Sequence, residues 1–126
     1  MLVTTRDKIL IENNKILNTG MSGIYVSNDA LTWHESGRVK SMMIRGNAFM
    51  NCEENSILIL PENRRFQGFV HENIYIENNL FVLNGIPALN VNSTKNIIMK
   101  KIILSMITWT LFMFLVEIKY QWIIMV

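Results

Sequence analysis

The chain has 126 residues, of which 50% are hydrophobic and 17% are charged, so it is long enough for one domain and too apolar to be disordered by composition. Its formal net charge is only +2, and no basic run alternates with aromatic residues, which argues against a nucleic-acid partner. The one cysteine excludes an internal disulfide and any zinc site built from cysteine pairs. Residues 1–6 lack the pattern of a secretory signal peptide.

A repeat of about 32 residues dominates residues 1–99. Asn14, Asn47 and Asn79 lie 33 and 32 residues apart, and each follows a short run of alternating apolar residues. Further apolar residues recur two, ten and twelve positions after each asparagine: Ile16, Ile24 and Val26; Phe49, Ile57 and Ile59; Phe81, Leu89 and Val91. Because the same register holds in three copies, we interpret the pattern as a structural repeat.

The repeat predicts the fold class. Short alternating runs separated by Asn or Gly are typical of strands joined by turns, and no amphipathic helical stretch precedes residue 97. Such strands at a fixed period predict an all-β fold, a right-handed parallel β-helix of about three to four coils, over residues 1–99. Equivalent apolar residues would stack about 4.8 Å apart, and the three asparagines would form a hydrogen-bonded ladder in one turn.

The copies differ in length, and the differences predict where a binding site would lie. From Ile74 to Ile97 is 23 residues, a bare coil, whereas residues 27–38 and 60–73 are inserted into the first two copies. Loops inserted on one face of a solenoid commonly build its binding surface.

Residues 100–126 differ from the repeat and form an apolar C-terminal tail. They contain no Asn or Gly, residues 102–116 carry no charge, and the next asparagine turn does not follow Met99. Three hypotheses explain this tail: a membrane anchor, although a spanning helix needs about 20 apolar residues; a buried apolar helix; or sequence read out of frame after a lesion in a longer gene. We expect a domain boundary after residue 99, and a membrane partner only if residues 100–126 form an anchor.

Several stretches of the chain resemble one enzyme family. They are residues 23–30, the block Trp33-His34-Glu35-Ser36-Gly37, and residues 44–52, 60–62 and 71–74. Together they are similar to the right-handed parallel β-helix glycoside hydrolases of family 110, the α-1,3-galactosidase type, whose members are several times longer than this chain. The resemblance implies an exo-acting, inverting removal of terminal α-linked galactose from glycans, and an extracellular or cell-surface location.

Three carboxylates are the predicted catalytic residues. An inverting glycosidase needs an acid and a base about 6.5–9.5 Å apart. Asp29 and Glu62 follow Asn14 and Asn47 by fifteen residues each, so they should project from equivalent points on adjacent coils, and Glu35 in the same loop is the third candidate. The alternative is that Asp29 is a turn residue and Glu62 a solvated loop charge.

Three further residues are predicted to bind substrate. Trp33 would stack on a sugar face or cap the core, Arg64 would bond sugar hydroxyls or be solvated, and His71 would contact substrate or bond only within the loops. No cluster of metal ligands is visible, so neither a metal nor another cofactor is expected.

The function therefore has alternatives that the sequence leaves open. The leading hypothesis is a carbohydrate-active enzyme fragment with a glycan substrate; the others are a non-catalytic β-helix glycan-binding or surface module and a tail-anchored membrane protein. We expect little hydrolase activity from this chain by itself, because a β-helix site draws residues from several coils and catalysis falls sharply when groups are misplaced by about 1 Å.

Overall fold

The computed structural model describes residues 1–28, 37–62, 68–106, 116–119 and 123–125. These residues form strands and turns, and no helix occurs among them. The strands are β1 (Leu2–Val3), β2 (Lys8–Glu12), β3 (Lys15–Thr19), β4 (Ile24–Val26), β5 (Ser41–Arg45), β6 (Ala48–Cys52), β7 (Ile57–Ile59), β8 (His71–Glu77), β9 (Leu80–Leu83), β10 (Leu89–Asn92), β11 (Thr94–Lys100), β12 (Ile103–Met106), β13 (Val116–Lys119) and β14 (Ile123–Met125).

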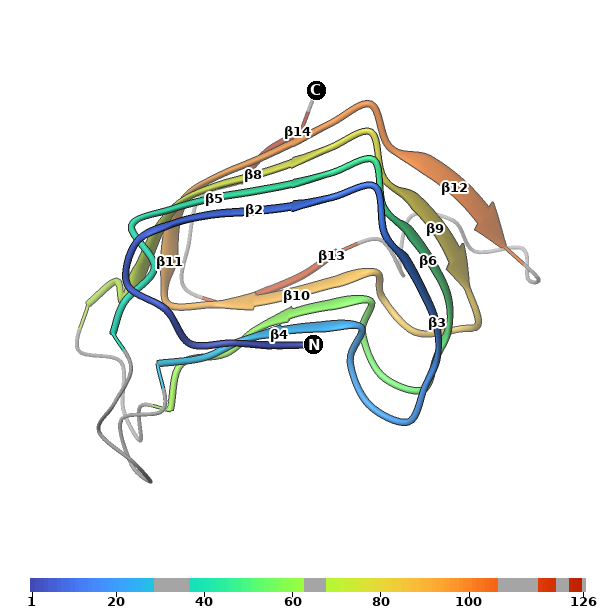
Figure 1. Cartoon of the computed structure of the whole chain (residues 1–126), viewed down its shortest axis with the longest axis horizontal. Helices are drawn as coiled ribbons and strands as arrows, with labels where there is room; N and C mark the ends of the chain where they lie inside the picture. Colours follow the sequence, from blue (N-terminus) through green and yellow to red (C-terminus); the bar gives the residue numbers. More distant parts are fainter. Residues whose placement is uncertain (29–36, 63–67, 107–115, 120–122, 126) are drawn as a thin grey trace.

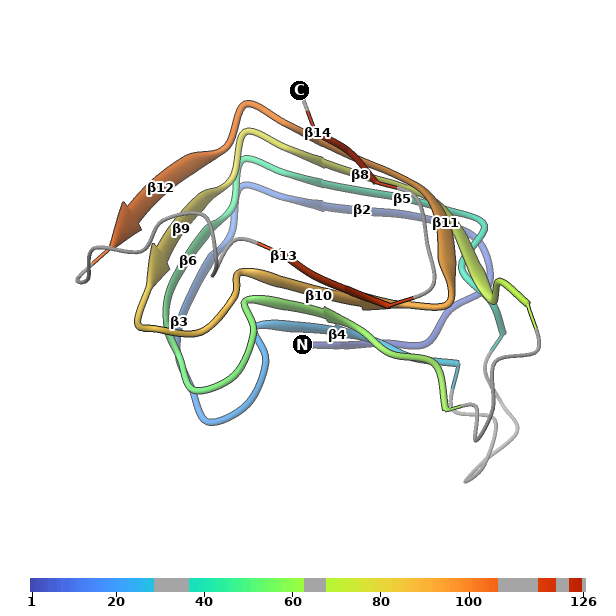
Figure 2. The same ribbon diagram turned by 180° about the vertical axis from the view of Figure 1, so that it is seen from behind.

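The strands lie in three parallel sheets, and each strand pairs with the third strand before or after it (Figure 1). Sheet A has the order β1-β4-β7-β10-β13, sheet B the order β14-β11-β8-β5-β2, and sheet C the order β12-β9-β6-β3. Seen from behind, the strands of successive coils again lie stacked in the same order (Figure 2). Successive triples from β2 to β13 thus make four coils, and the predicted parallel β-helix is confirmed.

The core consists of columns of equivalent apolar residues. Ile24 pairs with Ile57 and Ile57 with Leu89 in sheet A, and all three are fully buried. This is the column that the repeat predicts. In sheet C, Phe49 pairs with Phe81 and their rings stack with centroids 5.2 Å apart. Alternate residues of each strand point inward, and because the strands are in register these residues stack on their equivalents in the next coil. Burial of these stacked apolar side chains holds neighbouring coils together.

The predicted asparagine ladder is also present, in the turn between sheets B and C. The backbone amide of Asn14 donates to Oδ1 of Asn47 at 3.0 Å, and that of Asn47 donates to Oδ1 of Asn79 at 3.0 Å. The side-chain amides of Asn47 and Asn79 donate to the carbonyl oxygens of Ile11 and Ile44, each at 2.9 Å. These bonds satisfy backbone groups that a sharp turn would otherwise leave unpaired.

Residues 100–126 continue the coil in every part that the structure describes. β12 pairs with β9, β13 with β10 and β14 with β11, all in parallel. Lys101, at φ +49°, takes the left-handed turn position that Asn78, at φ +54°, takes one coil earlier. An asparagine is therefore not required for this turn, and the described parts of the tail are strands rather than a helix. The domain boundary after residue 99 and the out-of-frame origin stay predictions.

No helix among the described residues has the length and apolar character needed to cross a membrane.

Candidate functional site

One corner of the β-helix, between sheets A and B, carries the two long connections. Residues 27–40 join β4 to β5 and residues 60–70 join β7 to β8, whereas Ser93 alone joins β10 to β11. Because β4 pairs with β7 and β5 with β8, the two connections start and end side by side. The corner with inserted loops is therefore the one that the repeat lengths predict.

Four of the predicted site residues lie outside the described residues: Asp29, Trp33, Glu35 and Arg64. Their assignments to catalysis and substrate binding stay predictions. Glu62 and His71 are described, and they belong to the two ends of the second connection.

Glu62 lies against the first connection. It is partly buried, and its backbone amide donates to Oδ1 of Asn28 at 2.8 Å. Val26 pairs with Ile59 just before this bond, so the coils remain in step up to residues 28 and 62. Asn28 is the chain neighbour of Asp29, and the bond therefore joins the beginnings of the two connections on which the predicted carboxylates lie.

His71 is fully buried at the start of β8. Its Nδ1 atom accepts a hydrogen bond from the backbone amide of Val39 at 3.1 Å, so the ring proton of the neutral form is on Nε2. Nε2 has no hydrogen-bond partner among the described residues. Burial lowers the pKa of His71 to about 4, because the charged form loses its hydration. The ring is therefore neutral near pH 7 and joins the ends of both connections.

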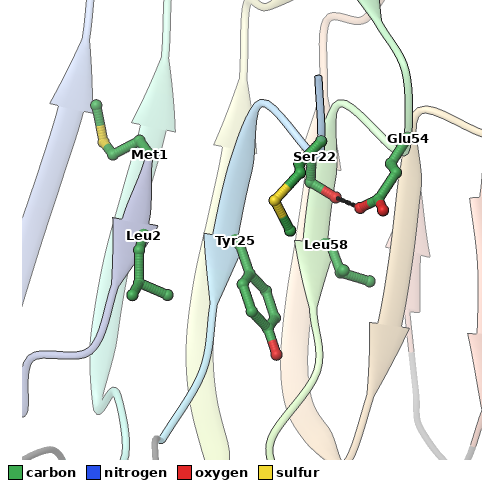
Figure 3. A pocket seen from close by; sticks show the side chains of 7 residues that line it. Met1, Leu2, Ser22, Tyr25, Glu54 and Leu58 are labelled. Carbon is green, nitrogen blue, oxygen red and sulfur yellow. Dashed lines mark hydrogen bonds between the residues drawn. The ribbon is translucent and has the colours of Figure 1, made fainter. Parts of the chain in front are cut away.

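A pocket of about 510 Å³ lies on the outer face of sheet A (Figure 3). Its walls are mostly apolar and include Leu2, Tyr25 and Leu58. At one end, the hydroxyl of Ser22 donates to Oε2 of Glu54 at 3.0 Å. Aromatic and apolar walls with one polar end suit the mixed surface of a sugar.

Sequence reasoning did not identify Ser22 and Glu54. The two residues are 32 positions apart, whereas the paired strands on either side of them have an offset of 33, as in Thr19 with Cys52 and Ile24 with Ile57. Aligning successive copies would therefore have paired Ser22 with Asn55, and no sequence signal pointed to Glu54. Glu54 is the one carboxylate that lines this pocket among the described residues, and no group of three potential metal ligands occurs in the same part of the chain.

Several curated bacterial proteins are similar in sequence to this chain. No family model matches it. It is 52% identical over 83 residues to an alpha-1,3-galactosidase A of Bacteroides thetaiotaomicron, which aligns 66% of this chain and 15% of the relative. It is 41% identical over 107 residues to an alpha-1,3-galactosidase A of Bacteroides fragilis, covering 79% of the chain and 18% of the relative. An alpha-1,3-galactosidase A of Akkermansia muciniphila is 41% identical over 96 residues, covering 76% of the chain and 16% of the relative.

The chain is therefore homologous to a segment of bacterial alpha-1,3-galactosidases, as its motifs indicated. The matched region spans less than one fifth of the length of these curated relatives.

Proposed function

We propose that this chain is part of a β-helix glycosidase that removes terminal α-1,3-linked galactose from extracellular or cell-surface glycans with inversion of configuration. The similarity to alpha-1,3-galactosidases supports the substrate class. One structural observation supports the catalytic pair: the hydrogen bond between Glu62 and Asn28. It joins the starts of the two long connections, next to the predicted acid and base Asp29 and Glu62.

The chemistry needs two carboxyl groups with different roles. One protonates the leaving oxygen and the other activates a water molecule on the opposite side of the sugar, at a separation of about 6.5–9.5 Å. Adjacent coils are about 4.8 Å apart, so side chains that diverge from equivalent points reach this range. Asp29 and Glu62 are the proposed pair, and Glu35 is the proposed substitute for either.

A second function is favoured by the pocket on sheet A. Its one carboxylate among the described residues, Glu54, is already bonded to Ser22. The pocket is therefore suited to hold a sugar, and the described part of its lining supplies one carboxylate where hydrolysis requires two. A non-catalytic glycan-binding module would use this surface and leave the galactoside intact.

The test compares this chain with an intact relative, because a catalytic site built from several coils needs its neighbours in place. In the Bacteroides thetaiotaomicron homologue, the residues aligned with Asp29 and Glu62 are replaced by Asn and Gln. Each replacement is expected to lower kcat for an α-1,3-linked galactoside by at least about a hundredfold.

The matched control is Gln at the position of Glu53, an exposed carboxylate in a turn on the far side of the coil, which should leave kcat unchanged. NMR of the first released galactose should show the β anomer, the product of inversion. Full activity after both replacements would contradict the site, release of the α anomer would contradict inversion, and binding without turnover by the intact relative would favour the binding module.

A further inference from the structure

We infer that a basic pocket at the base of the first inserted loop binds an anionic group, a sulfate ester or a sugar carboxylate, on the glycan. The pocket has a volume of about 440 Å³ and is lined by Arg6, Asp7, Gly37, Arg38 and Lys40. As a glycan subsite it rests on the proposed function, whereas its affinity for a simple oxyanion does not.

The parallel pairing of β2 and β5 brings these residues together. Lys8 pairs with Ser41, so the residues just before them, Asp7 and Lys40, are neighbours on adjacent coils. Gly37 and Arg38 directly follow the loop segment that holds Trp33 and Glu35. The pocket therefore includes the last residues of the same connection, 27–40, on which the proposed catalytic residue Glu35 lies.

Gly37 determines where the Arg6 side chain lies. A Cβ atom on Gly37 would collide with the Cγ, Cδ and Nε atoms of Arg6. The φ angle of Gly37 is not in the left-handed region, so the glycine is needed for space rather than for backbone conformation. The guanidinium group of Arg6 is thus packed against the backbone of the loop end, which lowers the entropy lost when it binds a ligand.

The charges of the pocket are not balanced within the described part of the chain. Three cations and one carboxylate line it, and none of Arg6, Arg38 and Lys40 forms an ion pair there. Glu72 lies next to Lys40 on the following coil, but its carboxylate is bonded to Lys95 at 3.1 Å. An anion in the pocket would therefore relieve the repulsion among these like charges.

The residue types indicate which anion fits. A guanidinium group presents parallel N–H donors that match two oxygens of a sulfate or carboxylate. A neutral galactoside offers no charge to these groups, so the pocket would add affinity only for a glycan that carries an acidic substituent near its terminal galactose.

The first experiment titrates the full chain with sodium sulfate at low ionic strength and follows backbone amide signals by NMR. Sulfate is expected to shift the amides of residues 6, 37, 38 and 40, and Arg38→Gln should raise the dissociation constant about three- to tenfold. Lys15→Gln removes the same charge from an exposed position on β3 and should leave the constant unchanged. Equal weakening by both variants, or no shift of the pocket amides, would overturn the inference.

A second variant separates geometry from charge. Gly37→Ala keeps every charge but displaces the Arg6 side chain, and it should weaken sulfate binding while the unfolding midpoint confirms a folded chain. Unchanged sulfate affinity in folded Gly37→Ala would overturn the role of Arg6, and Arg38→Lys should retain only part of the wild-type affinity because it lacks the planar donors.

The last experiment compares a neutral α-1,3-galactobioside with its 6-sulfated and uronic-acid-bearing forms. Both acidic forms should bind about three- to tenfold more tightly than the neutral one, and Arg38→Gln should abolish this advantage without changing the neutral affinity. A preference for one acidic form identifies the source of the anion. If sulfate binds but no galactoside does, the proposed function is wrong and the anion site stands; if all three galactosides bind equally, the anion subsite is wrong.

Discussion

The backbone amide of Val39 donates a hydrogen bond to Nδ1 of His71 at 3.1 Å, within the buried core of the loop-bearing corner. In return, the backbone amide of Glu72 donates to the carbonyl oxygen of Val39 at 3.0 Å. The two bonds join the end of the first inserted loop to the end of the second. His71 thus holds the chain at the ends of the two inserted loops together.

The stability of the chain should depend on pH through His71. Its pKa is lowered from 6.5 to about 4 in the folded chain, so the unfolded chain binds more protons between these values. Stability should therefore be complete above pH 6.5 and fall as the pH drops toward 4, by up to about 3 kcal/mol. Urea unfolding of the wild type and of His71→Gln at pH 4.5 and 7 tests this. The variant should lose the part of the pH dependence of the free energy of unfolding that His71 causes. Identical pH dependence of the two proteins would contradict the prediction.

The asparagine ladder should stabilise the fold mainly through its buried member. Asn47 is 1% exposed, and its removal leaves the carbonyl of Ile11 and the amide of Asn14 without their partners. Asn47→Ala is expected to lower the free energy of unfolding by about 2–4 kcal/mol. The matched variant Asn14→Ala, at the exposed end of the same ladder, should cost about 1 kcal/mol or less. Equal losses measured by urea denaturation would show that burial does not determine the effect.

Gly23 should tolerate no side chain, because a Cβ atom there would lie 2.7 Å from the carbonyl oxygen of Ser56 and 2.9 Å from Cδ1 of Phe49. Gly23→Ala is expected to destabilise the chain by about 1–3 kcal/mol. Gly20→Ala is the control, since its nearest neighbour would be Oε2 of Glu53 at 3.9 Å, and its effect should be within about 0.5 kcal/mol. A thermal unfolding midpoint that is unchanged in Gly23→Ala would refute the close packing of this turn.

Lys101→Gly should stabilise the chain. Lys101 adopts φ +49°, a conformation in which a side chain is strained and glycine is not. A gain of about 0.5–1 kcal/mol is expected. Lys100→Gly, one residue earlier at the end of β11, should instead destabilise, because glycine weakens a strand. If both variants change the unfolding midpoint in the same direction, Lys101 does not form the turn that continues the coil.

The repeat was readable from the sequence because it depends on local chemistry. Apolar residues alternate along each strand, and asparagine suits each turn, so Ile24, Ile57 and Leu89 share one register that the structure confirms. The continuation past residue 100 was not readable in this way, because Lys101 and Ile102 replace the asparagines of the turn. Parallel pairing of Ile103 with Leu80 holds this coil in register without the local signal.

The sequence by itself thus predicted the fold class, the first three coils and the corner that carries the inserted loops. Only the tertiary structure decided three contacts between coils that the repeat does not predict: the ring of His71 with the backbone of Val39, the hydroxyl of Ser22 with the carboxylate of Glu54, and the side chain of Arg6 with Gly37. The physical reason is that strand and turn preferences act over a few residues, whereas these contacts join residues about one coil apart. Their geometry follows from how the coils stack and how each chain segment leaves its strand, and no local pattern of residues encodes it.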